Sequence, residues 1–487
     1  MNLYSLFVER AQALVRPSGV VALLTPSGIA ADKGAAVFFK SIATTGRLGA
    51  LFDFENRKVF FADVHASFKF CTLVFGGPAR RFENTRCAFF LHALDDLAAP
   101  ERTLRLSAED FARVNPNTGA APIFRNARDS RIAMQVYAQH TVLVQHGAGN
   151  AQAQNRWAMQ YVRMFDMTTD SGLFRTAKWL QDEGFSRADL GRWRKGDQCA
   201  WPLYEGKMLQ AYDHRAADVV VNTGNLHRAA QPSPITARAK ADAGRMPAPQ
   251  YWVLEPELAE DVQYVLGYKD VTAPTNMRSM IAAILPRAGF GNTVPLLLPS
   301  STSAPQERAR ISALLLSLIN SSAFDFLARQ KIQGQHLNWF ILEQLPVIAP
   351  ARFEEPLPEP FTAAMRKAGL MNGHHANPSF ADFVIPQVLA LSYTAHDLAA
   401  FARDLGFVDA QGEVLPPITW NDADRRARLA ALDALFFHLY GLGADDAAYM
   451  LDTFPIVRQQ DEAAFGHYRT KADVLALLPL LQPADAD

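Results

Sequence analysis

Apolar and polar positions over the first 75 residues switch between helical and strand spacing. A stripe of apolar side chains predicts a helix over residues 2–14. The unbroken apolar run at residues 20–24 predicts a parallel strand buried on both faces. Further strands are expected over residues 48–54 and 68–75, on either side of Phe60 and Phe61. This order predicts an α/β unit, although a parallel sheet normally begins with a strand and a phosphate-binding turn rather than a helix.

The pattern beyond this unit divides the chain into three regions. Residues 1–97 form the α/β unit, with another strand expected over residues 87–91. Residues 98–350 mix short strands with helices and contain a Pro/Ala/Ser-rich flexible loop near residues 228–250. Residues 351–487 are helical. The main predictions outside the first unit are strands over residues 141–144, 280–285 and 294–298, and helices over residues 311–326, 386–405, 422–440 and 471–481. Asn421 and Asp422 can cap the helix that starts at residue 422.

Composition places the chain among soluble globular proteins. Of its 487 residues, 49% are hydrophobic and 20% are charged, which is enough for several domains with sizeable cores. The sequence shows neither an apolar run of about 18 residues nor a signal-peptide pattern, so we expect a cytoplasmic protein and no membrane segment. The cysteines at positions 71, 87 and 199 are too few and too scattered for a disulfide framework or a zinc site.

The net charge of −1 conceals an asymmetry along the chain. Residues 350–487 carry 10 Lys+Arg against 19 Asp+Glu, which leaves 38 against 30 in residues 1–349. A basic region of this kind is either a solvated surface or a surface that binds a polyanion such as DNA.

Few sequence motifs carry chemistry by themselves. The histidines do not fall at metal-ligand spacing, so we expect no metal site. The tetrapeptide Asn377-Pro378-Ser379-Phe380 lacks the preceding buried strand that a catalytic amino-methyltransferase motif requires, and it is interpreted as a loop. The pair Phe60 and Phe61 has two interpretations. It belongs to a hydrophobic core, or it forms an aromatic platform for a base taken out of the DNA stack.

At these residues the chain resembles a known family. The stretches 2–11, 14–19 and 20–27 resemble the region that follows the catalytic motif in adenine-specific (N6) DNA methyltransferases, in the TaqI-like class and the larger restriction-modification and phage-defence enzymes. The resemblance implies the back half of a class I, Rossmann-like methyltransferase sheet, including its closing antiparallel strand. The stretch from Val59 to Phe70 is similar to the family motif whose phenylalanine stacks on the flipped adenine, and the match favours Phe61 over Phe60.

The resemblance extends over nearly the whole chain. Its blocks are residues 115–125, 165–170, 202–208, 213–215, 275–278, 330–338, 449–457 and 468–471, which are similar to the target-recognition region and C-terminal helical block of the long members. It implies a mixed α+β target-recognition region over residues 98–350, then a helical region. The residues that it places at DNA are Lys207, Arg215, Asn276, Arg278, Lys331, Gln335 and His336. Basic and amide side chains of this kind contact phosphates and base edges.

The sequence therefore predicts the C-terminal part of a site-specific DNA adenine-N6 methyltransferase from a restriction-modification or phage-defence system. The complete enzyme would transfer a methyl group from S-adenosylmethionine to adenine in double-stranded DNA. We recognise neither the cofactor loop nor a complete catalytic site in the sequence, so we expect this chain alone to be inactive unless a separate chain supplies the missing half; a fragment of a longer enzyme and a natural split subunit both fit this pattern. The alternative is a non-catalytic DNA-recognition (specificity) subunit whose partner holds the chemistry.

Overall fold

The computed structural model describes residues 2–147, 152–221, 230–254, 260–300, 302–332, 334–372 and 376–482, which separate into two compact units. The N-terminal unit comprises Met1–Asn155, Gln330–Gln333 and Phe340–Val347. The C-terminal unit comprises Arg156–Arg329, Gly334–Trp339 and Ile348–Asp487. Both contain helices and strands, which confirms the mixed α/β class. The functional boundaries expected at residues 97 and 350 stay predictions.

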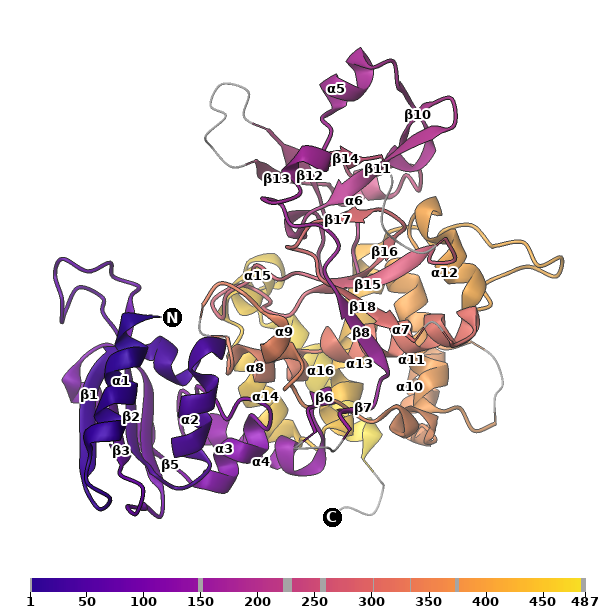
Figure 1. Cartoon of the computed structure of the whole chain (residues 1–487). Helices are drawn as coiled ribbons and strands as arrows, with labels where there is room; N and C mark the ends of the chain where they lie inside the picture. Colours follow the sequence, from indigo (N-terminus) through magenta and orange to yellow (C-terminus); the bar gives the residue numbers. More distant parts are fainter. Residues whose placement is uncertain are drawn as a thin grey trace. The chain divides into compact units, whose positions relative to one another are not determined.

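The N-terminal unit is built around one five-stranded sheet in the order β1-β3-β2-β4-β5 (Figure 1). The strands of the N-terminal unit are β1 (Val20–Pro26), β2 (Leu48–Glu55), β3 (Lys69–Gly76), β4 (Thr85–Leu91), β5 (Leu104–Leu106), β6 (Val144–Gln145) and β7 (Gln154–Asn155). Its helices are α1 (Leu3–Leu14), α2 (Ala36–Ala43), α3 (Ala108–Val114) and α4 (Ala127–Gln139). β3 runs antiparallel between β1 and β2, whereas β2 and β4 are parallel. The three strands β1, β2 and β4 therefore point in the same direction.

The core lies at the middle of this sheet. The spacing of apolar residues predicted the strands there correctly. β2 has mostly buried residues because β3 and β4 flank it. Helix α2 packs on the sheet through Phe38, whose ring meets that of Phe75 edge-on at 5.6 Å. The same helix contacts α3 through Phe39 and Phe111, at 6.3 Å between ring centres.

The first strand and first helix differ from the prediction in their burial. β1 is an edge strand that pairs antiparallel with β3, and its side chains alternate, with Val20 52% and Leu24 60% exposed. The prediction of a parallel strand buried on both faces is therefore wrong, because an apolar run does not reveal whether the strand has neighbours on both sides. The helix α1 forms as predicted, yet Leu3, Phe7 and Leu14 on its apolar stripe are all about two-thirds exposed.

The C-terminal unit combines several small sheets with a group of helices. Its strands are β8 (Met159–Val162), β9 (Ser186–Arg187), β10 (Trp193–Lys195), β11 (Gln198–Tyr204), β12 (Ala217–Val220), β13 (Gln231–Pro234), β14 (Trp252–Val253), β15 (Tyr264–Tyr268), β16 (Ala282–Pro286), β17 (Gly289–Phe290) and β18 (Leu296–Pro299). Its helices are α5 (Ala177–Asp182), α6 (Ala237–Lys240), α7 (Pro305–Ile319), α8 (Ser322–Arg329), α10 (Glu359–Lys367), α11 (Phe380–Ser392), α12 (Ala399–Asp404), α13 (Asp422–Leu439), α14 (Ala444–Asp452), α15 (Pro455–Phe465) and α16 (Arg469–Leu477). The short helix α9 (Trp339–Leu342) falls at the division between the units.

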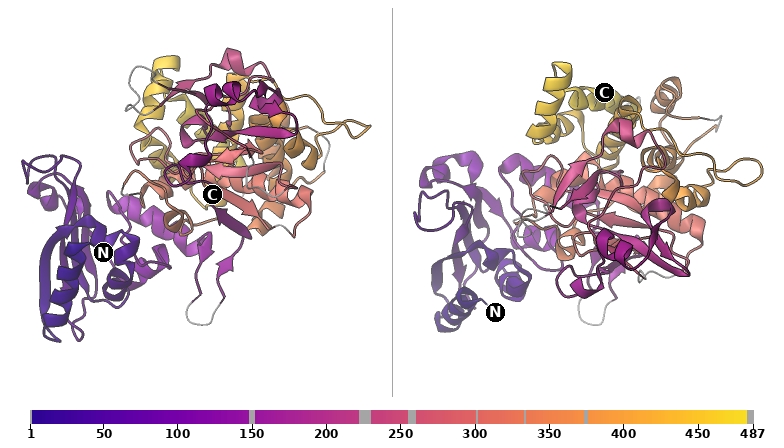
Figure 2. Two further views of the ribbon diagram at one scale, coloured as in Figure 1. Left: turned by 45° about the horizontal axis from the view of Figure 1, so that its top comes forward. Right: turned by 90° about the horizontal axis from the view of Figure 1, so that it is seen from above.

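Two sheets and the C-terminal helices organise this unit. One sheet has the order β16-β15-β18-β8, and the other has β14-β11-β10-β9 with β17 beside β11. The C-terminal helices, drawn in orange and yellow, gather together, and α13 packs against α11 and α16 (Figure 2). Asn421 caps α13 as predicted, since its side chain accepts from the backbone N–H groups of Ala423 and Asp424. Ser379 similarly caps α11, which gives residues 377–379 a role at a helix start.

Two predicted helices are each divided in the structure. The expected helix over residues 311–326 is divided into α7 and α8, which meet at a 62° bend. Asn320 lies at this bend, and its buried side chain donates to and accepts from the backbone of Ala282 at 2.9 Å in both directions. The expected helix over residues 386–405 starts earlier, as α11, and is followed by the separate helix α12.

The stretch near residues 228–250 is more ordered than its composition suggested. Its described part, residues 230–250, contains β13, which pairs with β12, and the short helix α6. Residues 228 and 229 lie outside the described residues. Among the described helices, none alone has the length and hydropathy of a membrane span, while the bent pair α7 and α8 meets that test only in combination.

Candidate functional site

The carboxyl ends of three strands lie along one edge of the N-terminal sheet. Ser27 follows β1, Asn56 follows β2, and His92 follows β4. Because these strands point the same way, the segments after them meet at the same edge, which is where α/β sheets place their ligand sites. This edge is the candidate site of the N-terminal unit.

Phe60 and Phe61 lie in the segment that joins β2 to β3 at this edge, and the structure gives them different environments. The ring of Phe60 packs edge-on against Phe54 at 5.3 Å and Phe70 at 5.2 Å, and it belongs to the hydrophobic core there. Phe61 is 42% exposed, and its ring touches only the outer side of this cluster, edge-on to Phe70 at 5.2 Å. Phe60 is therefore partly buried against the core, whereas Phe61 has the more accessible ring; the role of either ring in base stacking stays a prediction.

Asn56 fixes the backbone on which Phe61 stands. Its fully buried side chain donates to the carbonyl oxygens of Phe61 and Val64 at 2.8 and 2.9 Å, and its own oxygen accepts from the N–H of Phe61 at 2.9 Å. The preceding turn has positive φ at Arg57 and Lys58, which a non-glycine residue adopts only when its surroundings require it. The backbone that carries the exposed ring of Phe61 is therefore held in place before any ligand binds.

A buried carboxyl group lies behind this aromatic cluster. Asp53, on β2, accepts a hydrogen bond from the Ser27 hydroxyl. Burial raises the pKa of Asp53, while the Ser27 hydrogen bond and the charge of Lys69 oppose the increase. Lys69 also lies 4.8 Å from the ring centre of Phe90, a residue of β4 with a positive φ of 53°. The edge therefore combines stacking surface with basic and acidic groups.

Four of the residues that the resemblance places at DNA are engaged within the protein. Lys207 pairs with Glu205 at 3.0 Å, and Arg278 lies 2.8 Å from the buried carboxylate of Asp325. Arg215 is completely buried, and its guanidinium donates to four backbone carbonyl groups. All three side chains hold the C-terminal unit together, and their contact with DNA stays a prediction.

The fourth engaged residue is Lys331, in the N-terminal unit. Its ammonium donates to the carbonyl oxygens of Val114 and Gln344 and to the side-chain oxygen of Asn115. Burial lowers the pKa of Lys331 well below its ordinary value of 10.5. A buried lysine with three oxygen acceptors has a structural role, so its predicted DNA contact also stays untested.

The remaining three predicted residues, Asn276, Gln335 and His336, are exposed in the C-terminal unit. His336 lies 3.2 Å from Asp270, and Arg163 lies 3.6 Å from the same carboxylate. Sequence reasoning missed Arg163 and its neighbour Tyr161, although the alternation of apolar and basic residues over 157–165 was the available signal.

A stacked aromatic pair lies beside this group. The ring of Tyr161 stacks on Trp339 at 4.8 Å with an angle of 22° between the planes, and the Tyr161 hydroxyl accepts from Arg163 at 2.7 Å. Cationic and aromatic groups together are typical of surfaces that bind nucleic acid.

A second group of arginines that lie over tryptophan rings, which the sequence analysis did not identify, occurs on β9, β10 and β11. Arg187 lies over the ring of Trp193 at 4.7 Å, and Arg192 lies over Trp201 at 5.1 Å. Arg194 is exposed beside them. Arginines and tryptophans interleave over residues 187–201, and this was the signal in the sequence. Among the described residues, no group of three His, Cys, Asp or Glu side chains is arranged to hold a metal ion.

Comparisons with solved structures include distant likenesses to two restriction enzymes. No family model matches the chain, and no curated protein matches it. The structure of the type IIL restriction-modification enzyme MmeI in complex with DNA matches 93% of this chain and 52% of its own, at 10% identity and a TM-score of 0.38. The type IIG restriction endonuclease BpuSI matches 91% of this chain and 50% of its own, at 11% identity and a TM-score of 0.27.

This chain thus spans about half the length of each of the two proteins. Both TM-scores are below 0.5, so the functional conclusion is drawn from the residues of this chain alone.

Proposed function

We propose that this chain is the DNA-recognising, C-terminal part of a DNA adenine-N6 methyltransferase of a restriction-modification or phage-defence system, and that Phe61 forms one wall of its target-base pocket. The observation that carries the proposal is the ring of Phe61, exposed at the carboxyl edge of the sheet and held there by the buried Asn56. A base extruded from DNA needs an aromatic face to stack on, and a ring fixed beforehand loses little conformational entropy on binding.

The unpaired side of the sheet supports a role as part of a larger catalytic fold. Among the described strands β1 pairs with β3 alone, so its other edge presents unpaired backbone groups. Exposed apolar side chains accompany this edge on β1 and on α1. A further strand and helix that carry the cofactor loop and the catalytic tetrapeptide would pair with β1 and cover these side chains.

S-adenosylmethionine would supply the methyl group when bound by that further segment. The described residues of this chain do not form a glycine-rich cofactor loop. Their proposed part is to stack the adenine on Phe61 and to hold the DNA. The positive charge of residues 1–349 favours DNA binding through its phosphates.

A non-catalytic DNA-recognition subunit is the second candidate. The exposed arginines on β9 and β10 favour it, because basic side chains bind DNA phosphates without any methyl transfer. The two candidates differ at Phe61, which has a role in base stacking only in the first.

Fluorescence of 2-aminopurine tests the stacking directly on the full chain. A DNA duplex with an unpaired 2-aminopurine is titrated with the wild-type protein and with Phe61→Ala. Stacking on Phe61 should quench the probe and the variant should lose the quenching, whereas the matched variant Phe68→Ala, at a 52% exposed ring before β3, should keep it. Equal quenching by wild type and Phe61→Ala contradicts the assignment. DNA binding without any quenching supports the recognition subunit.

Methyl transfer to DNA by the purified chain provides a second test. We expect no transfer by the chain alone, and transfer after addition of a chain that carries the cofactor loop and the catalytic tetrapeptide. Robust activity of the isolated chain would show that its site is complete, contrary to the proposal.

A further inference from the structure

The two faces of the N-terminal sheet differ in how far they are covered. The side chains of one face are buried: Leu51, Leu73 and Cys87, which are in register on β2, β3 and β4, are at most 1% exposed. Helix α2 packs on this face, where its Phe38 meets the ring of Phe75. A sheet with parallel strands, such as β2 and β4, normally has a covering layer on both faces. We therefore expect the other face to be covered as well.

The chain itself covers only part of that other face. At the carboxyl end of the strands, the aromatic cluster around Phe60 packs on it. Beyond this cluster, Val20 and Leu24 on β1 are 52% and 60% exposed, and Val74 on β3 and Phe52 on β2 are partly exposed. Neighbouring strands lie about 4.8 Å apart, so these side chains form an apolar strip about 10 Å wide over β1, β3 and β2.

Two arginines lie beside this apolar strip, on the next two strands. Arg86 on β4 and Arg105 on β5 are directly opposite each other in an antiparallel pair, and both are exposed. The guanidinium of Arg86 lies 5.6 Å from the ring centre of Phe52, on the same face. Among the described residues, no carboxylate pairs with either guanidinium. Like charges at directly opposed positions destabilise a sheet, so an anionic group from outside would relieve this pair.

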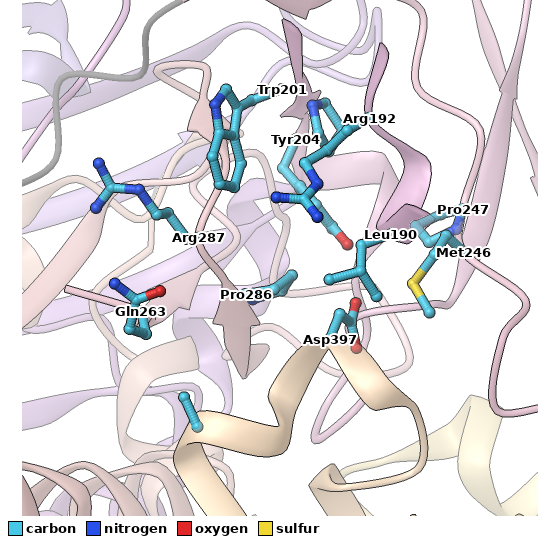
Figure 3. Close-up of a pocket in the computed structure, with 12 residues that line it drawn as sticks. Leu190, Arg192, Trp201, Tyr204, Met246, Pro247, Gln263, Pro286, Arg287 and Asp397 are labelled. Atoms are coloured by element: carbon cyan, nitrogen blue, oxygen red, sulfur yellow. The ribbon is translucent and has the colours of Figure 1, made fainter. Parts of the chain in front are cut away.

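The charged groups at a cavity of about 120 Å³ in the C-terminal unit differ in this respect (Figure 3). The indole of Trp201 lies between two arginines there, with its ring centre 5.1 and 5.7 Å from their guanidinium carbons. Each charged group has a partner within the chain: Arg192 donates to Asp189, Arg287 donates to the carbonyl oxygen of Val262, and Asp397 lies 2.9 Å from the buried His214. The pair Arg86 and Arg105 is therefore the stronger candidate for an external partner.

The chemistry of the open face selects its occupant. The phosphates of DNA can meet the two arginines, but they would leave Val20 and Leu24 in water. A second copy packed through the same face brings no carboxylate to the arginines, because the described side chains exposed on this face are apolar, uncharged or basic. An amphipathic helix is about 10 Å wide, which matches the apolar strip, and acidic residues along one flank would reach β4 and β5.

We propose that this face docks an amphipathic helix of a partner chain, whose apolar side covers Val20, Leu24 and Phe52 and whose acidic flank pairs with Arg86 and Arg105. The inference rests on the proposed function for the existence of a partner. It deepens that proposal by naming the surface that the partner covers and the charge that the partner carries.

Fluorescence anisotropy of a labelled peptide tests the docking on the full chain. The probe is a helical peptide of about 18 residues with leucines at i, i+3, i+4 and i+7 spacing and glutamates along one flank, and the matched peptide has lysines in place of the glutamates. We expect the wild-type protein to bind the glutamate peptide about tenfold more tightly, because glutamates attract the two arginines and lysines are repelled. Equal affinity for both peptides would overturn the proposal.

Charge reversal locates the acidic contact. The double variant Arg86→Glu with Arg105→Glu should prefer the lysine peptide, whereas Arg10→Glu, at an exposed arginine of α1, should keep the wild-type preference. A double variant that still prefers the glutamate peptide would place the peptide elsewhere and contradict the proposal.

Leu24→Asp tests the apolar contact. This change should weaken the binding of the glutamate peptide about tenfold, because it sets an unpaired charge against the leucines. Val37→Asp, at an 86% exposed residue of α2, is the matched control and should bind as the wild type does. Unchanged binding by Leu24→Asp would show that the apolar strip is not part of the docking surface.

The melting temperature in the absence of peptide tests whether the two arginines lack a partner within the chain. Arg105→Glu replaces a pair of like charges by an ion pair across β4 and β5, so it should raise the melting temperature by about 1–3 °C. Arg10→Glu should change it little. A lower melting temperature for Arg105→Glu would show that Arg105 already has a stabilising partner, contrary to the proposal.

Competition with duplex DNA decides between a protein and a DNA occupant. We expect the glutamate peptide to stay bound when DNA is added. Displacement of the peptide by DNA, together with loss of DNA binding by the double variant, would assign this face to DNA and overturn the proposal. None of these measurements involves Phe61 or methyl transfer, so failure here leaves the proposed base stacking unaffected.

Discussion

The two units hold their candidate binding groups by different physical means. In the N-terminal unit, the uncharged side chain of Asn56 and a cluster of phenylalanine rings fix Phe61. In the C-terminal unit, Trp201 fixes two arginines, and the buried His214 contacts the acidic group of the cavity. Stacking on an aromatic face tolerates any base and depends little on charge, whereas contacts between arginine and phosphate weaken steeply with salt. The first group therefore depends on uncharged contacts, and the second on cation–π and ionic contacts.

Replacing Arg278 is expected to have the largest effect and tests whether buried charges stabilise the C-terminal unit. Arg278→Met leaves the fully buried carboxylate of Asp325 without its 2.8 Å partner. We expect a loss of about 3–5 kcal/mol in the free energy of unfolding, measured by urea denaturation. The control Arg194→Met, at an exposed arginine, should change it by less than about 0.5 kcal/mol. A stable Arg278→Met protein with weakened DNA binding would instead support the DNA contact that the resemblance implies.

Asn56→Ala tests how strongly the uncharged side chain of Asn56 holds the backbone of Phe61 in the N-terminal unit. The change removes the four hydrogen bonds that join the Asn56 side chain to the backbone of Phe61, Val64 and His65. We expect a loss of about 2–3 kcal/mol in unfolding free energy, together with faster proteolysis in the segment 57–67. Asn2→Ala, at an exposed asparagine, is the control and should have little effect. If Asn56→Ala leaves both measurements unchanged, the loop is fixed by its aromatic contacts alone.

Measuring DNA affinity as a function of salt concentration, for one variant in each unit, compares the two units directly. Phe61→Ala should weaken binding of DNA with an unpaired adenine by roughly 1–3 kcal/mol at every salt concentration, because the lost contact carries no charge. Arg194→Ala should instead reduce the slope of log affinity against log salt by about 1, if its guanidinium contacts one phosphate. Fluorescence anisotropy over a salt series measures both quantities. A slope that changes with Phe61→Ala would remove the distinction between the units.

The smallest expected effect is the pH dependence at Asp53. Because burial raises its pKa above the ordinary 3.8, the folded state keeps this proton at a pH where the unfolded chain releases it. The stability that the group contributes is present at low pH and is lost as pH rises through its folded-state pKa. Asp53→Asn should therefore gain stability relative to wild type between pH 4 and pH 8, as measured by denaturation at both values. Asp63→Asn, at an exposed aspartate, should show no such difference.

The sequence by itself determined those features that depend on neighbouring residues. The spacing of apolar residues located β2, β3 and β4, and the polar residues at 421 and 422 marked the start of α13. The resemblance singled out Phe61 over Phe60, and the structure gives Phe61 the more accessible ring, although its role in base stacking stays a prediction.

Tertiary structure alone decided which elements acquire partners. β1 has the apolar run of a buried strand but lies at the edge of its sheet, and the helix expected over residues 311–326 is broken where Asn320 meets the backbone of Ala282. Lys331 is as basic in sequence as any DNA-binding lysine, yet its ammonium is buried among three oxygen acceptors. The local sequence indicates which side chains can be buried and which are charged. It does not report which distant residues will lie together, as Trp201, Arg287 and Asp397 do around one cavity.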